Sequence, residues 1–589
     1  MKQRKNILAG TLLLAMLTGL LGGCGNETTE SGTSEAMGSS VQSQQAQEEG
    51  AQGAAEQSEA AEMIKTEEAS EVDSVSEPEA GGAAVTLPLT EEPAMLTYWT
   101  TVSPMYADAI TSLDDCLLWN QMMEDTGVRV EGILVNAQSG AEQFALMVAS
   151  GEYYDLLDSP GANYTTGLAG ALDDDVLVDL TDIVDTLMPN YKAIIGSNEE
   201  YSKGTRIDDG RIGMIYGLNN VDYKPTEGPV IRQDWLDALG LDTPKTYDQL
   251  HDVLEAFRDQ YGASMWIPYS GSPLGNYLGA GYGIATTYLT HMSGREPFFQ
   301  VDGTVKFGPM EDSYYDYLTM LHQWYEEGLI WNDFVSYTER FNQPPDGGIT
   351  SGQFGVWFSS YQNFPVWTAS AEDPNFHIVA FSDPVQQEGD ENHLRAENFL
   401  VTNGGVGIST SCQNVELAAK LIDYWFSDEG RYFLTFGIEG TTYELDENGH
   451  PQYTDLILNN PDGLSQAAAK ALYLGDFGFH TVDHDDYIYL DTGLTDDQTE
   501  ASDIWTATSD NSYGIPNVVS MTVEESTENA SLLSDIGTYV STWTLQAITG
   551  DQKLTEETFA EFRATLENQL HIDQCIANKQ AALDRYNLR

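Results

Sequence analysis

Basic residues are scarce in this chain of 589 residues. It has 25 lysines and arginines against 93 aspartates and glutamates, which gives a formal net charge of −68. A chain this acidic repels the phosphates of nucleic acids and of anionic lipids, so we expect neither nucleic-acid binding nor a basic membrane-surface helix. Hydrophobic residues make up 41% and aromatic residues 11%. That apolar content predicts a folded chain with two or three core-forming units.

Cysteine is also rare, with four residues and no Cys-x-x-Cys pair. One of them, Cys24, follows an apolar N-terminal stretch. The other three, Cys116, Cys412 and Cys575, are widely spaced and odd in number. We expect three buried free thiols, with one disulfide as the alternative. A disulfide scaffold is not indicated, and a chain of this length does not need one.

Catalytic and metal-binding signatures are largely missing. The sequence has no Gly-x-Ser-x-Gly, no phosphate-binding Gly-x-x-x-x-Gly-Lys and no His-Glu-x-x-His. His480 and His484, beside Asp485 and Asp486, would share a face if helical and could then bind a metal, but the local composition favours a surface loop. The run 173–175 of three aspartates lacks the spacing of a calcium loop and favours an exposed acidic turn. We therefore predict no metal and no cofactor.

No hydrophobic run is long enough to span a membrane. Ile7–Leu21 has 15 apolar or small residues, fewer than the ~20 of a membrane helix, and follows a basic segment, as in a signal peptide. The sequence Leu21-Gly22-Gly23-Cys24 resembles the lipobox of bacterial lipoproteins, which implies cleavage after residue 23 and a diacylglycerol on Cys24. The alternative is an ordinary signal peptide with an incidental cysteine. Two acyl chains would anchor the protein to the outer face of the cell membrane.

A low-complexity segment follows the anchor. Residues 25–93 are rich in Ser, Gly, Ala, Gln and Glu, with 16 acidic residues against the single basic Lys65. We predict a disordered tether over residues 24–93, long enough to suit a Gram-positive cell face. After the three basic residues of the leader and the net −15 of this segment are removed, the body from Ala94 carries −56.

The body begins with alternating strands and helices. Strands are predicted at 95–100, 128–135 and 154–158, and helices near 114–125 and at 141–150, the last two closed by Gly127 and Gly151. This order predicts a parallel sheet with right-handed crossovers. Ligands of such sheets bind beyond the carboxyl ends of the strands, which places the segments after Trp99 and Asp158 at the mouth of a crevice. Further along, Thr246, Asn414 and Thr555 are predicted helix N-caps.

Several motifs along the body, roughly from Ala94 to Arg589, resemble those of one family in their order. The main one is Gly228–Thr246, Gly-Pro-Val-Ile-Arg-Gln-Asp-Trp-Leu-Asp-Ala-Leu-Gly-Leu-Asp-Thr-Pro-Lys-Thr. The others are Glu142–Tyr154, Asp182–Tyr191, Asp209–Ile212, Asp302–Pro309, Glu327–Ile330, Glu429–Gly430, Gly437–Tyr443 and Ala582–Asn587. Together they are similar to the lipoprotein extracellular solute-binding proteins of sugar-type ABC importers, in the group that binds complex oligosaccharides. Residues 480–511 depart from the pattern.

The resemblance implies an α/β fold of two periplasmic-binding-protein-like lobes joined by hinge crossovers, with the ligand cleft between them. Lobe one would be 94–220 plus 405–445, and lobe two 221–404 plus 446–589. Hinge closure would bury an oligosaccharide and present the closed protein to the permease subunits of an ABC transporter. The resemblance also implies a monomer without catalytic activity.

Within this implied cleft, sugars need aromatic faces and planar polar groups. The predicted ligand-binding residues are Trp99, Arg232, Trp266, Tyr269, Asn276, Trp357 and Tyr361. Trp99 ends a predicted strand, whereas Trp266 and Trp357 are placed in loops. The alternative for each tryptophan is a position in the hydrophobic core. The alternative for Arg232 is a structural ion pair with a lobe-one carboxylate.

Two other functions stay open at this stage. The chain could bind peptides or another small polar solute for the same transporter class. It could also be a surface polysaccharide hydrolase or lyase, since pairs of carboxylates are abundant in so acidic a chain.

Overall fold

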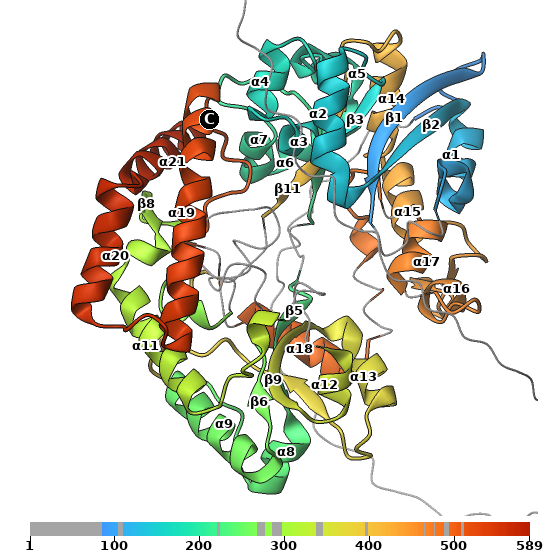
Figure 1. Ribbon diagram of the computed structural model, residues 1–589. Coiled ribbons are helices and arrows are strands. Elements are labelled where there is room, and N and C mark those ends of the chain that lie inside the picture. Colours follow the sequence, from blue (N-terminus) through green and yellow to red (C-terminus); the bar gives the residue numbers. More distant parts are fainter. Residues whose placement is uncertain are drawn as a thin grey trace, which may run out of the picture. The chain divides into compact units, whose positions relative to one another are not determined.

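The computed structural model describes residues 85–589, apart from 104–109, 221–223, 268–276, 285–296, 337–344, 395–398, 465, 476, 488–489, 491–493, 508–509 and 511 (Figure 1). The expected signal peptide at 1–23, the lipidated Cys24 and almost all of the tether at 24–93 lie outside the described residues. The chain divides into two units, Met1–Glu77 and Pro78–Arg589, and the second contains everything described below.

A five-stranded sheet organises the first part of the body. Its order is β2-β1-β3-β11-β4. Its strands are β1 Ala94–Val102, β2 Val128–Asn136, β3 Leu156–Asp158, β4 Ile215–Leu218 and β11 Val401–Ile408. β1 runs parallel to β2 and β3, and β11 runs antiparallel to β3 and β4. The predicted parallel β-α-β-α-β unit is therefore confirmed, and the late strand β11 inserts beside it.

Helices precede or follow each of these strands. They are α1 Leu117–Thr126, α2 Gly140–Ser150, α3 Pro160–Asn163, α4 Gly167–Asp173, α5 Thr181–Leu187, α6 Pro189–Ser197, α7 Glu199–Gly204, α14 Val415–Tyr424 and α15 Asp428–Phe436. Gly127 and Gly151 both have φ of 71° directly after α1 and α2, a left-handed conformation that closes a helix at low cost only for glycine. Both predicted helix ends are confirmed.

A second, four-stranded sheet has the order β10-β5-β9-β6. Its strands are β5 Glu227–Arg232, β6 Ser264–Met265, β9 Phe354–Ser360 and β10 Ile378–Ala380. β5 pairs antiparallel with β9 and β10. The placement of Trp357 in a loop was wrong, because β9 continues to Ser360 and pairs Trp357 with Val230 of β5. Two hairpins complete the strands, β7 Phe298–Val301 with β8 Thr304–Phe307, and β12 Tyr443–Leu445 with β13 Pro451–Tyr453.

The remaining helices follow the second sheet or the late hairpin. They are α8 Gln233–Leu239, α9 Tyr247–Tyr261, α11 Asp312–Glu326, α12 Asp346–Thr350, α13 Phe364–Ser370, α16 Asp455–Leu458, α17 Gln466–Tyr473, α18 Asp496–Ala507, α19 Val523–Thr549, α20 Glu556–Asn568 and α21 Ile572–Asn587. The side chains of Thr246, Asn414 and Thr555 accept hydrogen bonds from the first turns of α9, α14 and α20. All three predicted caps are confirmed.

The two sheets have separate hydrophobic cores. The first core gathers side chains of β1–β4, β11 and α14. The second core joins α9 and α11 to α19, α20 and α21. Residues of the segment 457–482 pack on the side of the first sheet, among them Ile457, Leu474, Phe477 and Val482. Burial therefore groups this segment with the first sheet, although its sequence position lies far beyond β11.

Three connections lead from one sheet to the other. They follow β4, β10 and the segment that ends near Val482. The first two are hydrogen-bonded to each other, since Asn219 N–H donates to Leu400 O (2.8 Å) and its side chain donates to Phe399 O (2.9 Å). After the third, α18 packs against β5 and β10 of the second sheet.

Cys116, Cys412 and Cys575 are buried thiols that form no disulfide, as predicted. Burial, with a smaller contribution from Asp115, raises the pKa of Cys116 to about 12, and the thiol is therefore unreactive at neutral pH. Within the described part of the chain, no helix has the length and apolar character needed to cross a membrane.

Candidate functional site

The carboxyl ends of three strands meet at one edge of the five-stranded sheet. β1 and β3 are parallel, and β4 runs in their direction because both β3 and β4 oppose β11. Thr100, two residues before the end of β1, therefore lies beside Asp158, the last residue of β3. Ligands of open α/β sheets bind at such an edge, and the sequence predicted the ligand there.

Asp158 is the centre of a buried polar cluster at this edge. Its side chain accepts hydrogen bonds from Thr100 Oγ1 (2.8 Å) and Ser159 Oγ (2.7 Å), and its Oδ1 lies 2.9 Å from His480 Nε2. Burial alone would raise the pKa of Asp158, but the hydrogen bond and charge of His480, followed by Ser159 and Thr100, outweigh it and lower that pKa. The cluster therefore holds an ionised carboxylate at the carboxyl edge.

His480 reaches this carboxylate through a gap left by Gly404. A Cβ on Gly404 would lie 2.9 Å from His480 Cε1 and 3.1 Å from its Nδ1, closer than a side chain can approach. Ser159, next to Asp158, has φ of 48°, which a non-glycine residue rarely adopts. The edge is therefore shaped by close backbone approach and local strain, features that concentrate at functional sites.

Aromatic rings hold the segment that carries His480 in place. Phe479 stacks on Trp119 with ring centroids 4.0 Å apart, and Trp425 meets Phe479 edge-on at 5.2 Å. Tyr98 of β1 donates a hydrogen bond to Gly478 O (2.6 Å). The sequence predicted a ligand at this edge but did not pair His480 with Asp158, because the two residues are 322 positions apart and no local spacing links them.

His484 does not join His480. Its Nε2 lies 3.3 Å from Asp428 and its Nδ1 lies 3.7 Å from Asp486, so the two histidines contact different carboxylates. The pair considered as a metal site in the sequence is therefore split between two environments.

The predicted aromatic ligand residues are buried in this conformation. Trp99 packs edge-on against Phe144 in the first core, with ring centroids 5.2 Å apart. Trp266, Trp357 and Tyr361 come together in a cluster beside the second sheet. The exposed fractions are 2% for Trp99, 1% for Trp266, 0% for Trp357 and 8% for Tyr361. The packing of these side chains agrees with core positions, which were the alternative considered from the sequence. Their role in ligand binding stays a prediction.

Two further predicted ligand residues, Tyr269 and Asn276, lie outside the described residues.

Arg232 is 1% exposed and contacts residues of α8 and of the segment before β10. Its Nε and Nη2 donate to both oxygens of Asp234 (2.8 and 2.6 Å), and Nη2 lies 3.4 Å from Asp373. Its guanidinium carbon lies 4.0 Å from the ring centroid of Trp235 and 4.5 Å from that of Phe376. Arg232 therefore forms a structural ion pair, but with carboxylates beside its own sheet and not with a lobe-one partner.

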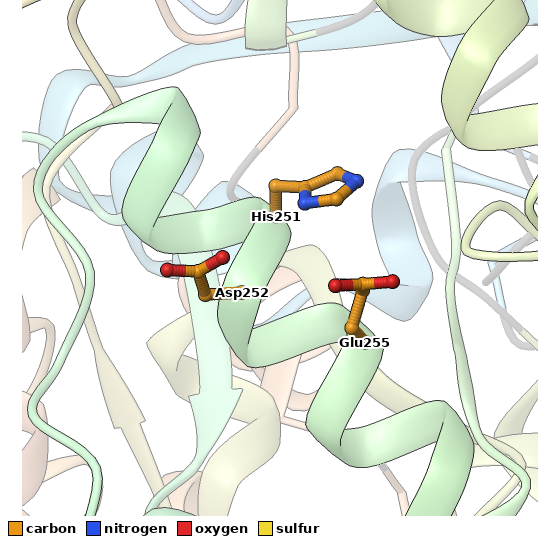
Figure 2. A group of neighbouring side chains, drawn as sticks. All are labelled: His251, Asp252 and Glu255. Atoms are coloured by element: carbon orange, nitrogen blue, oxygen red, sulfur yellow. The ribbon is translucent and has the colours of Figure 1, made fainter.

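Three potential metal ligands project from one stretch of α9. Figure 2 shows His251, Asp252 and Glu255, whose nearest ligand atoms lie within 4.8 Å of one another. His251 Nε2 also lies 2.6 Å from Glu327, and Glu255 pairs with Arg258 at 3.3 Å. These ion pairs account for the arrangement without a cation, and we assign no metal to it.

One constellation bears on the hydrolase alternative. Ser512 Oγ, His393 and Asp510 lie together, as in a nucleophilic triad. Both Ser512 Oγ (3.2 Å) and Asp510 (3.1 Å), however, contact the same ring nitrogen, Nδ1. A triad needs the serine and the carboxylate on opposite nitrogens, so this geometry cannot relay a proton between them.

Two open grooves lie elsewhere on the described surface. One of about 770 Å³ follows α19, and its lining residues are Val335, Ser534, Gly537, Thr538, Ser541, Thr542, Leu545, Gln546, Thr549 and Asp551. The other, of about 360 Å³, is lined by Asp179, Thr181, Asp182, Asp209, Gly210 and Arg211. Neither shares a residue with the Asp158 cluster. Because neither groove contains a buried polar group directed at a ligand, the chemistry of the Asp158 edge makes it the better candidate site.

Solved structures match the fold over most of the chain. The alginate-binding protein AlgQ2 is 20% identical, with a TM-score of 0.65, covering 84% of this chain and 99% of that one. An HMO-binding, ABC-transporter-associated solute-binding protein from Bifidobacterium longum infantis is 19% identical, with a TM-score of 0.68, covering 84% of this chain and 99% of that one. The periplasmic-binding-protein-like α/β fold is thus confirmed.

Curated relatives and a family match add the sequence relationship. The fructooligosaccharide ABC transporter substrate-binding protein FusA of Streptococcus pneumoniae is 27% identical over 371 residues, which span 60% of this chain and 64% of FusA. Lipoprotein LipO of Bacillus subtilis is 24% identical over 58% of this chain and 67% of its own length. The family described as bacterial extracellular solute-binding protein matches residues 116–432, more than half of the chain. The chain therefore belongs to the bacterial extracellular solute-binding protein family.

Proposed function

We propose that this protein captures an oligosaccharide outside the cell and delivers it to the permease of an ABC importer without cleaving it. The observation that carries the proposal is the family match over 116–432, together with a carboxyl-edge site in a fold of this kind. FusA, a relative named as a fructooligosaccharide ABC transporter substrate-binding protein, supports a sugar over a peptide. The match to FusA spans 60% of this chain and 64% of FusA, less than two thirds of either, so the ligand class is an inference for this protein.

The proposal includes two lobes. We assign 94–220, the strand β11 and the helices α14 and α15 to lobe one, and most of 227–380 with 496–589 to lobe two. The separate cores of the two sheets support this division. The packing of Ile457, Leu474 and Val482 supports placing residues 446–482 in lobe one, which differs there from the sequence-based boundary. The three connections between the sheets would then be the hinge.

We place the ligand at the edge formed by Asp158, Ser159 and His480. An ionised, buried carboxylate with a neighbouring imidazole offers the acceptor and donor groups that sugar hydroxyls need. The predicted residues Trp99, Arg232, Trp266, Trp357 and Tyr361 stay candidates for a conformation in which their core clusters open.

The location is also a proposal. A lipid on Cys24 and the acidic segment 24–93 would tether a monomer to the outer membrane face of a Gram-positive cell. LipO, a relative named as a lipoprotein, supports this anchoring.

Thermal unfolding of the full chain with a ligand panel tests the function. The panel would hold fructooligosaccharides, oligogalacturonates, milk oligosaccharides and peptides. A ligand at 100 times its Kd should stabilise the folded state by about 2.7 kcal/mol. We expect a shift with one sugar class and intact sugar afterwards. A shift with peptides alone would support the peptide-binding alternative, and cleaved sugar would support the enzyme.

A further inference from the structure

The C-terminal helix α21 is tied to the loop between α7 and β4 through one carboxylate. Arg585 Nε donates to Asp208 Oδ2 (2.5 Å), and Arg589 Nη2 donates to Asp208 Oδ1 (2.5 Å). Arg589 also donates to the carbonyl oxygens of Lys203 (3.2 Å) and Arg206. Arg585 and Arg589 both lie within the last five residues of the chain, and both bind this one short loop.

The same arginines hold the start of α19. Arg585 binds both oxygens of Glu525 (2.9 and 2.6 Å), and Arg589 donates to Ser520 Oγ (2.9 Å). Burial alone would raise the pKa of Glu525, but the hydrogen bonds and charge of Arg585, together with the hydrogen bonds from Thr522, outweigh burial and lower that pKa. The groups form a connected network, which we call the C-terminal clamp and define as Asp208, Glu525, Arg585 and Arg589.

The clamp joins elements of different cores. Leu583 and Tyr586 of α21 belong to the second core, whereas Ile207, next to Asp208, belongs to the first. The Arg589 side chain is 5% exposed and those of Glu525 and Asp208 are 17% and 20% exposed. Partly buried, multidentate pairs of this kind are screened less by salt than single surface pairs, and their geometry is fixed.

The clamp also lies beside the connections between the sheets. A Cβ on Gly204 would lie 2.7 Å from Val401 and 3.2 Å from Val518, so the α7 end is packed against both β11 and the segment before α19. Leu400 N–H, in the second connection, donates to Glu200 of α7 (3.1 Å). An ion pair is lost when its atoms separate by more than about 4 Å, so it survives a rigid rotation only near the rotation axis.

We propose that the C-terminal clamp is a fixed pivot, about which the lobe carrying α19 and α21 rotates against the lobe carrying the five-stranded sheet. The inference rests on the lobe motion of the proposed function, but it is independent of which ligand binds. With the clamp fixed, the distance between the lobes changes little near α21 and most at positions far from it. The lobes therefore open by rotation and do not slide past each other.

Distances between pairs of nitroxide labels test the pivot on the full chain without any ligand, with Cys24 replaced by serine. One pair, called the near pair, is close to the clamp in the sequence: Ser197→Cys, eleven residues before Asp208, with Ser531→Cys, six residues after Glu525. The other, called the far pair, joins α2 to α13: Leu146→Cys with Val366→Cys, which are 57% and 64% exposed in the native chain. We expect a narrow distance distribution for the near pair and a broader one for the far pair.

Substitution of the clamp completes the test. Asp208→Asn should broaden the near-pair distribution, and Arg589→Gln should do so to a smaller extent. Asp312→Asn, which removes the exposed single pair with Arg563, is the matched control and should change nothing. A near pair as broad as the far pair in the unsubstituted protein would overturn the pivot. An unchanged near pair in folded Asp208→Asn or, if that variant does not fold, in Arg589→Gln would overturn it as well.

Discussion

At the scale of single residues, the cluster around Asp158 sets the chemistry of the candidate site. The carboxylate is buried, yet its pKa is lowered because His480, Ser159 and Thr100 donate to it or stabilise its charge. A group whose pKa is lowered on folding stabilises the native state above its unfolded-state pKa of about 3.9. That stabilisation is lost as the pH falls through the folded-state value.

Asp158→Asn should therefore destabilise the protein by about 1.5–3 kcal/mol at pH 7, the usual contribution of hydrogen bonds to a charged group. The difference from the unsubstituted protein should shrink as the pH falls below about 4. Urea unfolding of both proteins between pH 3 and pH 7 measures it. Asp114→Asn, at an exposed pair with Arg129, is the control and should cost less than about 1 kcal/mol. A difference that does not change with pH would contradict an ionised Asp158.

Trp357 shows why the predicted aromatic residues need careful substitution. Its side chain is fully buried, within β9 and edge-on to Trp367 at 5.8 Å. Trp357→Ala should cost about 3–5 kcal/mol through the cavity it leaves, whereas Trp357→Phe should cost clearly less. Chemical denaturation of the two variants measures this, and a stable alanine variant would show that the residue is not a core residue. Affinity tests of the predicted role should therefore use the phenylalanine variant.

These residues also mark the limit of sequence-based prediction of the site. The alternative of a core position for the tryptophans follows from their size and was considered from sequence. Trp357 was misplaced because Ser359 and Ser360 are typical of loops, whereas pairing with β5 extends the strand to Ser360. His480 could not be assigned, since its partner Asp158 is distant in sequence and the pair is made by the fold.

At the scale of elements, the sequence was sufficient to predict helix ends that are set by interactions within one turn. The caps Thr246, Asn414 and Thr555 and the glycine stops Gly127 and Gly151 act within one helix turn, and all were predicted. The position of β11 between β3 and β4 was not predicted, because it depends on pairing across some two hundred residues.

One helix start depends on a residue from another helix. Asp423 of α14 accepts hydrogen bonds from the backbone N–H groups of Asn190 (3.0 Å) and Tyr191 (2.9 Å) at the start of α6, and from the Asn190 side chain (2.8 Å). Burial raises the pKa of Asp423 in spite of these bonds, which shows how strongly the site disfavours a free charge. The two helices are thereby fixed to each other.

Asp423→Ala should lower the free energy of unfolding by about 2–3 kcal/mol, because three donors lose their acceptor. Asp423→Asn should cost less than about 1.5 kcal/mol. Its carbonyl oxygen can still accept from the backbone, and the amide of Asn190, whose oxygen has no partner, can turn to accept from it. Urea unfolding of the two variants compares them, and equal losses would contradict this account.

At the scale of the whole molecule, two sheets with separate cores are joined by three connections and, beside them, the C-terminal clamp. The overall α/β class and the family followed from motif order in the sequence. The packing of residues 457–482 beside the first sheet did not, because it depends on long-range contacts around Trp119 and Leu118. The molecule thus has the parts that hinge closure over a ligand requires.

The measurement that tests the central claim most directly is titration calorimetry of the full chain with the oligosaccharide class selected by thermal unfolding. We expect one binding site per chain, intact sugar after the titration, and at least tenfold weaker binding by Asp158→Asn, with Asp114→Asn unchanged. Absence of binding by every sugar, or sugar recovered in cleaved form, would contradict capture for transport. Sugar binding that Asp158→Asn leaves unchanged would move the site away from the carboxyl edge.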